Sequence, residues 1–585
     1  MLKRFSKFVN GYWILTLLCP VLVCIDVFIE LQIPTLMGEI VDLIQSAETT
    51  GFSKEALWAK LAELLGICFL TLIIGYCASR CSAIASMGFG SNMRRALFNK
   101  IQDLSFENID RLKIASLITR MTNDVTSVQS VFSSVIVTFI KGPLLLIMAL
   151  YYAVSLSPSL SKIFYIAVPA IFITLMVLGY LAVPLFKAML EKTDKFNAAL
   201  RSNINGIRVV KSFVREEHEK ENFNKVNEEV KKANIKARIL VLYITPIIMF
   251  VIYGCIVFSL YSGSEILIYK TQEDFTYGQL TSFIAYISQV LSSLMTVLMV
   301  FVTMTIAKAS ISRVNEVFDE VPTITDENAD ENNMVETGDI EFRNVNFKYS
   351  KDAVENVLEN INLTIKEGET IGIIGGTGSS KTTLVNLIAR LYDASEGEVL
   401  VSGKNVQDYK FPNLRQEISI VLQQNILFSG TIRENILWGD LGASQEDVER
   451  AAKAAQAHDF IMESDKGYDT EVGQGGTLLS GGQKQRLCIA RSLLRNPKIL
   501  ILDDSTSAVD THTDSKIREF LKSDDFKNTT KIVIAQRITS IMNADRIVVM
   551  ENGKIDGVGS HDELVKSNEI YKEIFVSQQE GVLAQ

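Results

Sequence analysis

The sequence predicts a two-part chain, in which an all-α membrane domain is followed by an α/β domain. Of its 585 residues, 48% are hydrophobic, and these residues concentrate in the first half. That half contains six apolar segments, each long enough to cross a hydrocarbon core of about 30 Å as a helix. Beyond residue 320, short β-rich runs alternate with helical ones, which is typical of an α/β domain. We therefore expect a transmembrane domain at 1–320, an acidic linker at 321–338 and a second domain at 339–585.

The six apolar segments define the expected transmembrane helices. They lie near residues 12–37, 61–83, 132–156, 163–186, 239–262 and 278–305. Four of them contain a proline, which membrane helices tolerate because neighbouring groups satisfy the freed backbone carbonyl. The charged N-terminus and the apolar run after it resemble a signal peptide, but the run continues past Met37 without a small-residue cleavage site. We therefore expect the first segment to be a retained membrane anchor.

The connections between these segments alternate in charge. The two long connections, after the second and the fourth segment, are rich in Lys and Arg, whereas the other connections are short and contain few. The positive-inside rule places the long connections and both termini in the cytosol. Their apolar residues recur at helical spacing without proline, which predicts helices that continue beyond the bilayer and turn back, rather than loosely ordered loops.

Three charged residues lie well inside the apolar segments, away from their ends. Asp26 and Glu30 lie one helical turn apart in the first, and Lys141 lies in the third. Charged groups in hydrocarbon normally face a partner or a water-filled cavity. One interpretation is a substrate or proton site. The other, which we favour, is a Glu30–Lys141 ion pair that locks two helices together.

Charge and cysteine usage exclude two classes of protein. The formal net charge is −9, so nothing in the composition indicates nucleic acid as a partner. The seven cysteines lie mostly in apolar runs and lack CxxC metal spacing. They are typical of small buried hydrophobic residues rather than of a disulfide framework.

The second domain begins with a near match to a phosphate-binding loop. The run ETIGIIGG leads into GGTGSSKTT, Gly375 to Thr383, and then into a helical stretch. In a strand–loop–helix context, the loop amides cradle phosphates, Lys381 reaches the β and γ groups, and Thr382 holds Mg²⁺. The strict pattern GxxxxGK[ST] fails at one position, because Ser380 stands where its last glycine belongs. By itself, this loop could be a chance match.

Two further motifs give the loop its context. LLSGGQKQR, Leu478 to Arg486, contains an unbroken LSGGQ, and the apolar strand ILILDD ends in Asp503, which is placed to bind Mg²⁺ through water. With these motifs the sequence resembles ATP-binding cassette (ABC) transporters of the exporter type, over nearly its whole length and in the family's motif order. The resemblance implies an all-α six-helix transmembrane domain with long cytosolic helix extensions, followed by an α/β P-loop ABC ATPase domain that uses ATP and Mg²⁺.

The resemblance also assigns roles to residues. Tyr349 would stack on the adenine, and Gln423 would touch Mg²⁺ and sense the γ-phosphate. The stretches 105–113 and 206–214 would be coupling helices. Metal contacts would come from Thr382, Gln423 and Asp503. Nucleotide contacts would come from Tyr349, Gly375, Gly376, Thr377, Gly378, Ser379, Ser380, Lys381, Thr382, Thr383 and Gln423, and Ser480, Gly481, Gly482 and Gln483 would face the ATP of another subunit.

Three positions depart from the family pattern around one phosphate pocket. The family's catalytic glutamate is replaced by Asp504, its γ-phosphate histidine by Gln536, and its last loop glycine by Ser380. Asp504 withdraws its carboxylate by about 1 Å, and a misplacement of that order reduces rates by about 100-fold. Gln536 cannot carry the positive charge of an imidazolium or relay a proton. We expect a pocket that holds ATP and hydrolyses it slowly.

These departures affect only this chain's own pocket, because ABC sites combine the phosphate loop of one subunit with the LSGGQ of the other. The pattern resembles one half of a heterodimeric, multidrug-type exporter, with a second, non-identical half-transporter as its partner. Family logic implies amphiphilic cargo, such as drugs, lipids or peptides, and a multi-pass location in a bacterial inner or plasma membrane. Two alternatives are a homodimeric exporter that uses Asp504 as base and an ATP-gated regulatory or channel-like subunit.

Overall fold

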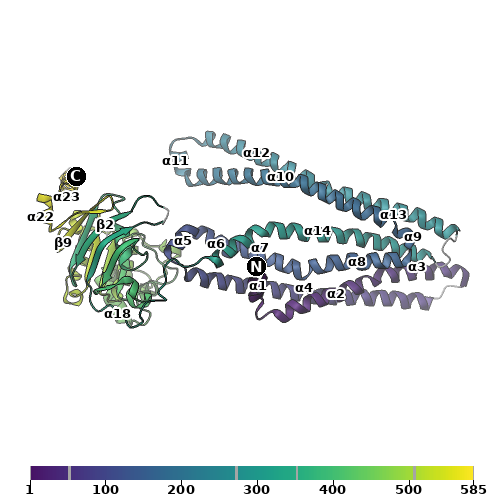
Figure 1. Cartoon of the computed structure of the whole chain (residues 1–585), viewed down its shortest axis with the longest axis horizontal. Helices are drawn as coiled ribbons and strands as arrows, with labels where there is room; N and C mark the ends of the chain where they lie inside the picture. Colours follow the sequence, from purple (N-terminus) through teal and green to yellow (C-terminus); the bar gives the residue numbers. More distant parts are fainter. Residues whose placement is uncertain (1, 51–53, 270–274, 351–352, 505–508, 584–585) are drawn as a thin grey trace. The chain divides into compact units, whose positions relative to one another are not determined.

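The computed structural model describes residues 2–50, 54–269, 275–350, 353–504 and 509–583 (Figure 1). The chain divides into two compact units. The first consists of Met1–Ile101 and Ala115–Asp319, and the second of Gln102–Ile114 and Glu320–Gln585. The short segment 102–114 therefore belongs to the second unit, although it is flanked on both sides in the sequence by residues of the first.

The first unit is entirely helical in its described residues. Six helical stretches, of 34 to 54 residues, are long and apolar enough to cross a membrane. A crossing needs about 20 residues, so each stretch continues well beyond it, as the sequence predicted. The helices are α1 (Leu2–Phe5), α2 (Trp13–Glu30), α3 (Gln32–Thr50), α4 (Lys54–Gln102), α6 (Ile114–Thr119), α7 (Val125–Ile136), α8 (Thr138–Leu156), α9 (Pro158–Ser161), α10 (Phe164–Asn205), α11 (Ile207–Ser212), α12 (Glu216–Leu242), α13 (Ile244–Tyr269) and α14 (Tyr277–Asp319), with a π-helical turn at Arg120–Asp124.

The helix α14 packs closely against α3 through glycines. A Cβ on Gly278 would lie 2.0 Å from the carbonyl oxygen of Gly38, so only glycine allows this approach. Asp42 of α3 also joins the two helices, because its carboxylate accepts hydrogen bonds from Thr276 Oγ1 and from the Gly278 amide, both at 2.7 Å. The carboxylate thereby satisfies an amide at the start of α14, where no intrahelical partner exists.

Two sheets organise the second unit. The four-stranded antiparallel sheet has the order β2–β1–β4–β5, and the six-stranded sheet has the order β10–β9–β3–β8–β7–β6, in which only β10 is antiparallel to its neighbour. The strands are β1 (Ile340–Phe347), β2 (Leu358–Ile365), β3 (Thr370–Gly375), β4 (Glu396–Val401), β5 (Lys404–Asn405), β6 (Ile418–Val421), β7 (Ile499–Asp503), β8 (Thr530–Ile534), β9 (Arg546–Glu551) and β10 (Lys554–Gly559).

Ten α-helices accompany these sheets in the described part of the unit. They are α5 (Phe106–Leu112), α15 (Lys381–Ile388), α16 (Phe411–Arg415), α17 (Ile432–Leu437), α18 (Gln445–Ala454), α19 (His458–Met462), α20 (Gly481–Leu494), α21 (Thr511–Phe520), α22 (His561–Ser567) and α23 (Glu569–Leu583).

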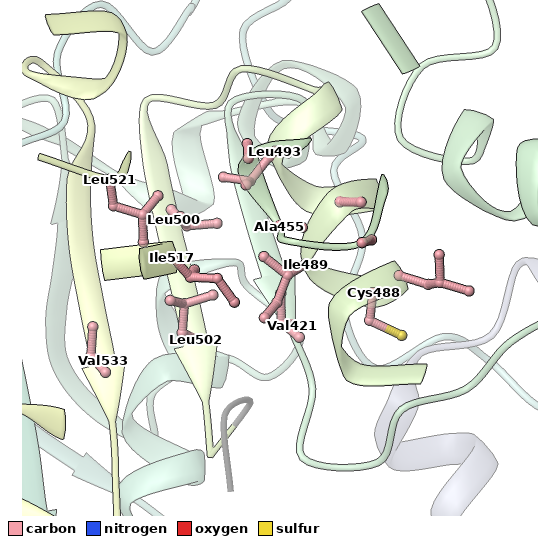
Figure 2. Close-up of a cluster of buried hydrophobic side chains, with 14 of the residues drawn as sticks. Val421, Ala455, Cys488, Ile489, Leu493, Leu500, Leu502, Ile517, Leu521 and Val533 are labelled. Atoms are coloured by element: carbon pink, nitrogen blue, oxygen red, sulfur yellow. The ribbon is translucent and has the colours of Figure 1, made fainter. Parts of the chain in front are cut away.

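The strand β7 shows why the sequence ILILDD is apolar without alternation. Leu500 and Leu502 belong to a core with Ile489 of α20 (Figure 2), whereas Ile499 and Ile501 belong to the core on the opposite face of the sheet. Successive side chains of a strand point to opposite faces, so a sheet that is covered on both faces needs a continuous apolar run. The run ends at Asp503, on the carboxyl edge of the sheet.

Candidate functional site

The carboxyl edge of the parallel sheet gathers most of the predicted site residues in one cavity. The strands β3, β7 and β8 end side by side there, because they are parallel neighbours or separated by one strand. Ligands of open α/β sheets bind outside this edge. The cavity has a volume of about 500 Å³, and it is lined by Gly375, Gly376, Thr377, Gly378, Ser380, Lys381, Thr382, Thr383, Gln423, Asp503, Asp504 and Gln536, together with Ile374, Ile534 and Ile574.

The loop between β3 and α15 curls around an ammonium group. Lys381 Nζ donates hydrogen bonds to the carbonyl oxygens of Gly375 and Gly376, at 2.9 and 2.8 Å, and to Ser379 Oγ at 3.0 Å. Burial lowers the pKa of Lys381, an effect that the nearby carboxylates of Asp503 and Asp504 oppose. The loop therefore presents a positive charge next to the N-terminus of α15, an arrangement suited to anionic phosphate.

Ser380 adopts a glycine-like conformation immediately before α15. Its φ is +70° and its ψ is 24°, in the left-handed region. This region costs a residue with a Cβ about 1–2 kcal/mol, which explains why the family pattern has glycine at this position. The serine therefore holds a backbone conformation that glycine adopts with less strain.

Oxygen groups suited to Mg²⁺ meet beside the loop. Thr382 Oγ1 donates a hydrogen bond to Asp503 Oδ2 at 2.8 Å, and the Gln423 amide lines the same cavity. Asp503 is 2% exposed, and burial raises its pKa, an effect that the Thr382 hydrogen bond partly offsets. Mg²⁺ prefers hydroxyl, carboxylate and carbonyl oxygens. The residues present therefore fit a Mg²⁺ ion bound together with a nucleotide phosphate.

Asp504 and Gln536, the two catalytic candidates, bind each other. Gln536 Nε2 donates a hydrogen bond to Asp504 Oδ2 at 2.8 Å. The Asp504 backbone has a φ of +48°, and its amide donates to the carbonyl oxygen of Ile534 at 2.9 Å. Burial raises the pKa of Asp504, against the opposing effects of Gln536 and Lys381. A neutral amide therefore holds the carboxylate from one side. The residues that follow, 505–508, lie outside the described residues.

Tyr349 lies beside the first turn of α15, outside the residues that line the cavity. Its hydroxyl shares a hydrogen bond of 2.8 Å with Thr383 Oγ1, and its ring packs edge-on against Phe347 and Tyr392. The side chain is 42% exposed, so part of the ring is open to a ligand. This position agrees with a flat ligand that extends from the loop towards Tyr349.

Tyr392 joins the segment 102–114 to the site, and sequence reasoning missed it. Its hydroxyl donates to Asp110 Oδ2 at 2.6 Å, and its ring lies 6.3 Å from that of Phe106 and 5.2 Å from that of Tyr349. The residue stands in an unremarkable stretch, RLYDAS, so no sequence signal marks it. A continuous row of aromatic rings thereby runs from α5 to Tyr349.

The helix α5 is also fixed at its start by buried polar contacts. Asn108 is fully buried; its Nδ2 donates to the Val321 carbonyl oxygen at 3.0 Å, and its Oδ1 accepts from the Thr323 amide at 3.2 Å. Ser105 Oγ accepts from the Ile324 amide at 2.9 Å. The first predicted coupling stretch is thus a short helix bound to residues 321–324.

The remaining predicted segments lie elsewhere. Ser480 caps α20, because its Oγ accepts from the Gln483 amide at 3.3 Å while Gln483 Oε1 accepts from the Ser480 amide at 2.9 Å. The structure does not bring the segment 480–483 to the cavity of its own chain. The second predicted coupling stretch, 206–214, contains α11, and Val209 and Phe213 expose their apolar side chains there.

Comparison with known proteins settles the family. Residues 16–294 match the ABC transporter transmembrane region, and residues 358–507 match the ABC transporter family. The chain belongs to the ABC transporters. The chain and the putative multidrug export ATP-binding/permease protein YgaD of Bacillus subtilis are 33% identical, over 99% of each. Identity with the uncharacterized ABC transporter ATP-binding protein YfiB of the same organism is 33%, over 99% of this chain and 98% of the relative.

Two further likenesses complete the comparison. An ATP-dependent lipid A-core flippase of Syntrophus aciditrophicus is 34% identical over 88% of this transporter and 84% of its own chain. A solved bacterial Atm1-family ABC exporter with ATP bound superposes with a TM-score of 0.77, at 24% identity over 98% of both chains. The fold class predicted from the sequence is thereby confirmed. This transporter is an ABC exporter, a multi-pass membrane protein whose helical region is fused to an ATPase domain.

Proposed function

We propose that this transporter is one half of a heterodimeric exporter. It binds ATP with Mg²⁺ in its own pocket and hydrolyses that ATP slowly, while its segment 479–483 completes the competent pocket of a second, non-identical half-transporter. The observation that carries the proposal is the hydrogen bond of 2.8 Å between Gln536 Nε2 and Asp504 Oδ2.

The geometry around Asp504 opposes its use as a general base. Its side chain is one methylene shorter than glutamate, and the Gln536 amide occupies one of its two oxygens. A general base must reach the attacking water at hydrogen-bond distance, and a shift of about 1 Å reduces the rate by about 100-fold. Gln536 can donate a hydrogen bond to phosphate, but it cannot supply an imidazolium charge. Slow hydrolysis follows from the two residues together.

Other parts of the pocket support retained binding of ATP. Lys381 remains at the centre of the loop, and Thr382 and Asp503 remain paired beside it. The segment Ser480–Gln483 keeps an intact capping box at the N-terminus of a 14-residue helix, where backbone amides favour phosphate. The chain therefore keeps the groups that bind nucleotide and those that it would offer to a partner, and departs from the family where water is activated.

We propose amphiphilic cargo, namely drugs, lipids or peptides, moved out of the cytosol by alternating access. The names of two relatives, a putative multidrug exporter and a lipid A-core flippase, support this class. The bacterial relatives support a bacterial inner or plasma membrane, and the basic connections support cytosolic termini.

The test is the ATPase rate of the purified chain in lipid nanodiscs, beside that of an Asp504→Asn variant. The proposal expects negligible turnover by both proteins while a fluorescent ATP analogue still binds. Brisk turnover that Asp504→Asn abolishes would refute it, because the shorter acid would then serve as base in a homodimer. Uphill transport by the assembled heterodimer distinguishes an exporter from a regulatory or channel-like subunit. In an exporter, this transport must stop when the partner's catalytic acid is replaced.

A further inference from the structure

A charged cluster lies among the transmembrane helices of the first unit. Lys141 Nζ on α8 donates to Asp26 Oδ2 on α2 at 2.9 Å and forms an ion pair of 3.0 Å with Glu30 Oε2. The sequence favoured a simple Glu30–Lys141 pair, whereas the structure places one ammonium between two carboxylates. With all three groups ionised, the cluster carries one more negative than positive charge.

One carboxylate oxygen of this cluster has no partner. Asp26 Oδ1 is buried and accepts no hydrogen bond from any described residue, and the side chain is only 9% exposed. Opposite this oxygen lies Gly75 of α4. A Cβ on Gly75 would lie 3.8 Å from Asp26 Oδ1 and would meet no other described side chain or neighbouring element within 4 Å. The protein thus leaves a charged acceptor unpaired next to a position where it supplies no side chain.

The surroundings of the cluster combine access with apolar surface. The side chains of Glu30 and Lys141 are 30% and 33% exposed, so the cluster is open on that side. Val23 and Val27 on α2 and Leu145 on α8, all buried in the helix cores, lie within four residues of Asp26 or Lys141 along their helices. Unpaired charge in a membrane helix is costly and usually marks a substrate or ion pathway. A negative, hydrogen-bond-accepting site between apolar helices suits a cation that carries N–H donors on an apolar body.

We propose that Asp26 and Glu30 bind the ammonium group of a cationic amphiphile, with Asp26 Oδ1 as the principal acceptor. Lys141 keeps the two carboxylates in place and is displaced from one of them when the ligand enters. The proposal rests on the proposed export function, because it names the class of cargo as amphiphilic amines.

The test is a binding measurement in the absence of nucleotide. The full chain in phosphatidylcholine nanodiscs is titrated with monodansylcadaverine, whose terminal ammonium is its only charge at pH 7, and with N-pentyl dansylamide, which lacks it. Wild type should bind the cation more tightly, and Asp26→Asn should weaken its binding by about tenfold or more, the value of a hydrogen bond to a charged group. Binding of the neutral probe should not change. Glu265 is an exposed residue of α13, and Glu265→Gln is the matched control, which should change neither affinity.

Two further variants separate a ligand site from a structural ion pair. Glu30→Gln should weaken cation binding by a smaller factor than Asp26→Asn, and it serves as the second test if the latter variant fails to fold. Lys141→Met should tighten cation binding, because it removes the competing ammonium. Equal affinity of wild type for both probes, or cation binding that is unchanged in both carboxylate variants, overturns the proposal, as does weaker binding in Lys141→Met. None of these binding measurements tests ATP hydrolysis. If the cation site is refuted, the proposed heterodimeric exporter is unaffected, and the ATPase rate of the chain does not decide whether the cation site exists.

Discussion

The contact between Tyr392 and Asp110 predicts how firmly α5 is attached to the ATPase domain. The Tyr392 hydroxyl donates to a carboxylate at only 2.6 Å, and hydrogen bonds to charged groups contribute about 1.5–3 kcal/mol. Tyr392→Phe removes this bond but keeps the ring contacts with Phe106 and Tyr349. If this bond must break whenever α5 opens locally, its loss lowers the free energy of that local opening by the same amount. Since 1.4 kcal/mol is tenfold, amides of α5 should exchange with solvent about 10–100 times faster.

Hydrogen exchange of the full-length protein, read by mass spectrometry over peptides that contain residues 106–112, measures this effect. Tyr409→Phe is the matched control, because the Tyr409 hydroxyl donates to the Val401 carbonyl oxygen at 2.8 Å in a buried site and makes no bond to α5. It should leave exchange in that peptide unchanged. Asp110→Asn should have an intermediate effect, because a neutral acceptor contributes about 0.5–1.5 kcal/mol. Wild-type exchange of α5 in Tyr392→Phe would refute the reasoning.

Three other predictions concern the nucleotide pocket. Ser380→Gly should remove the strain of the left-handed backbone and raise the free energy of unfolding by about 1 kcal/mol. The thermal unfolding midpoint of the ATPase domain should therefore rise, and an unchanged or lower midpoint would show that Ser380 is not strained. The double change Asp504→Glu with Gln536→His should raise the ATPase rate of the chain alone by at least about 100-fold, whereas unchanged turnover would place the defect elsewhere. Burial raises the pKa of Asp503, so the proton that displaces Mg²⁺ binds at a higher pH than for an ordinary aspartate. Titration of Mg²⁺-dependent ATP binding should show affinity lost as pH falls through that raised pKa, and Asp503→Asn should weaken this pH dependence.

The sequence motifs that predict the pocket are local. The loop 375–383 and the strand that ends at Asp503 can each be recognised from about ten consecutive residues. The parallel sheet then brings the loop and the end of that strand together. The apolar run of β7 could be interpreted as a strand covered on both faces for the same reason. Departures at Ser380, Asp504 and Gln536 were visible because a strict pattern stands beside them.

Contacts between distant segments were not predictable in the same way. Tyr392 lies about 280 residues from Asp110. Although Asp110 lies in the first predicted coupling stretch, nothing in the sequence marks Tyr392 as its partner. The membrane charges were noticed individually, but whether Lys141 pairs with one acid or with two depends on the rotation and depth of two packed helices. Hydrophobic periodicity determines which face of a helix is apolar, not which residue of the neighbouring helix it meets.

The composition of the second unit has a practical and evolutionary consequence. A fragment that starts at Glu320 would omit α5. The backbone groups that now hydrogen-bond to Asn108 and Ser105 would then hydrogen-bond to water; they belong to Val321, Thr323 and Ile324. Such a fragment would also leave the Tyr392 ring without Phe106 and the Tyr392 hydroxyl without Asp110. Exchange of ATPase domains between related transporters should therefore succeed more often when residues 102–114 travel with the domain.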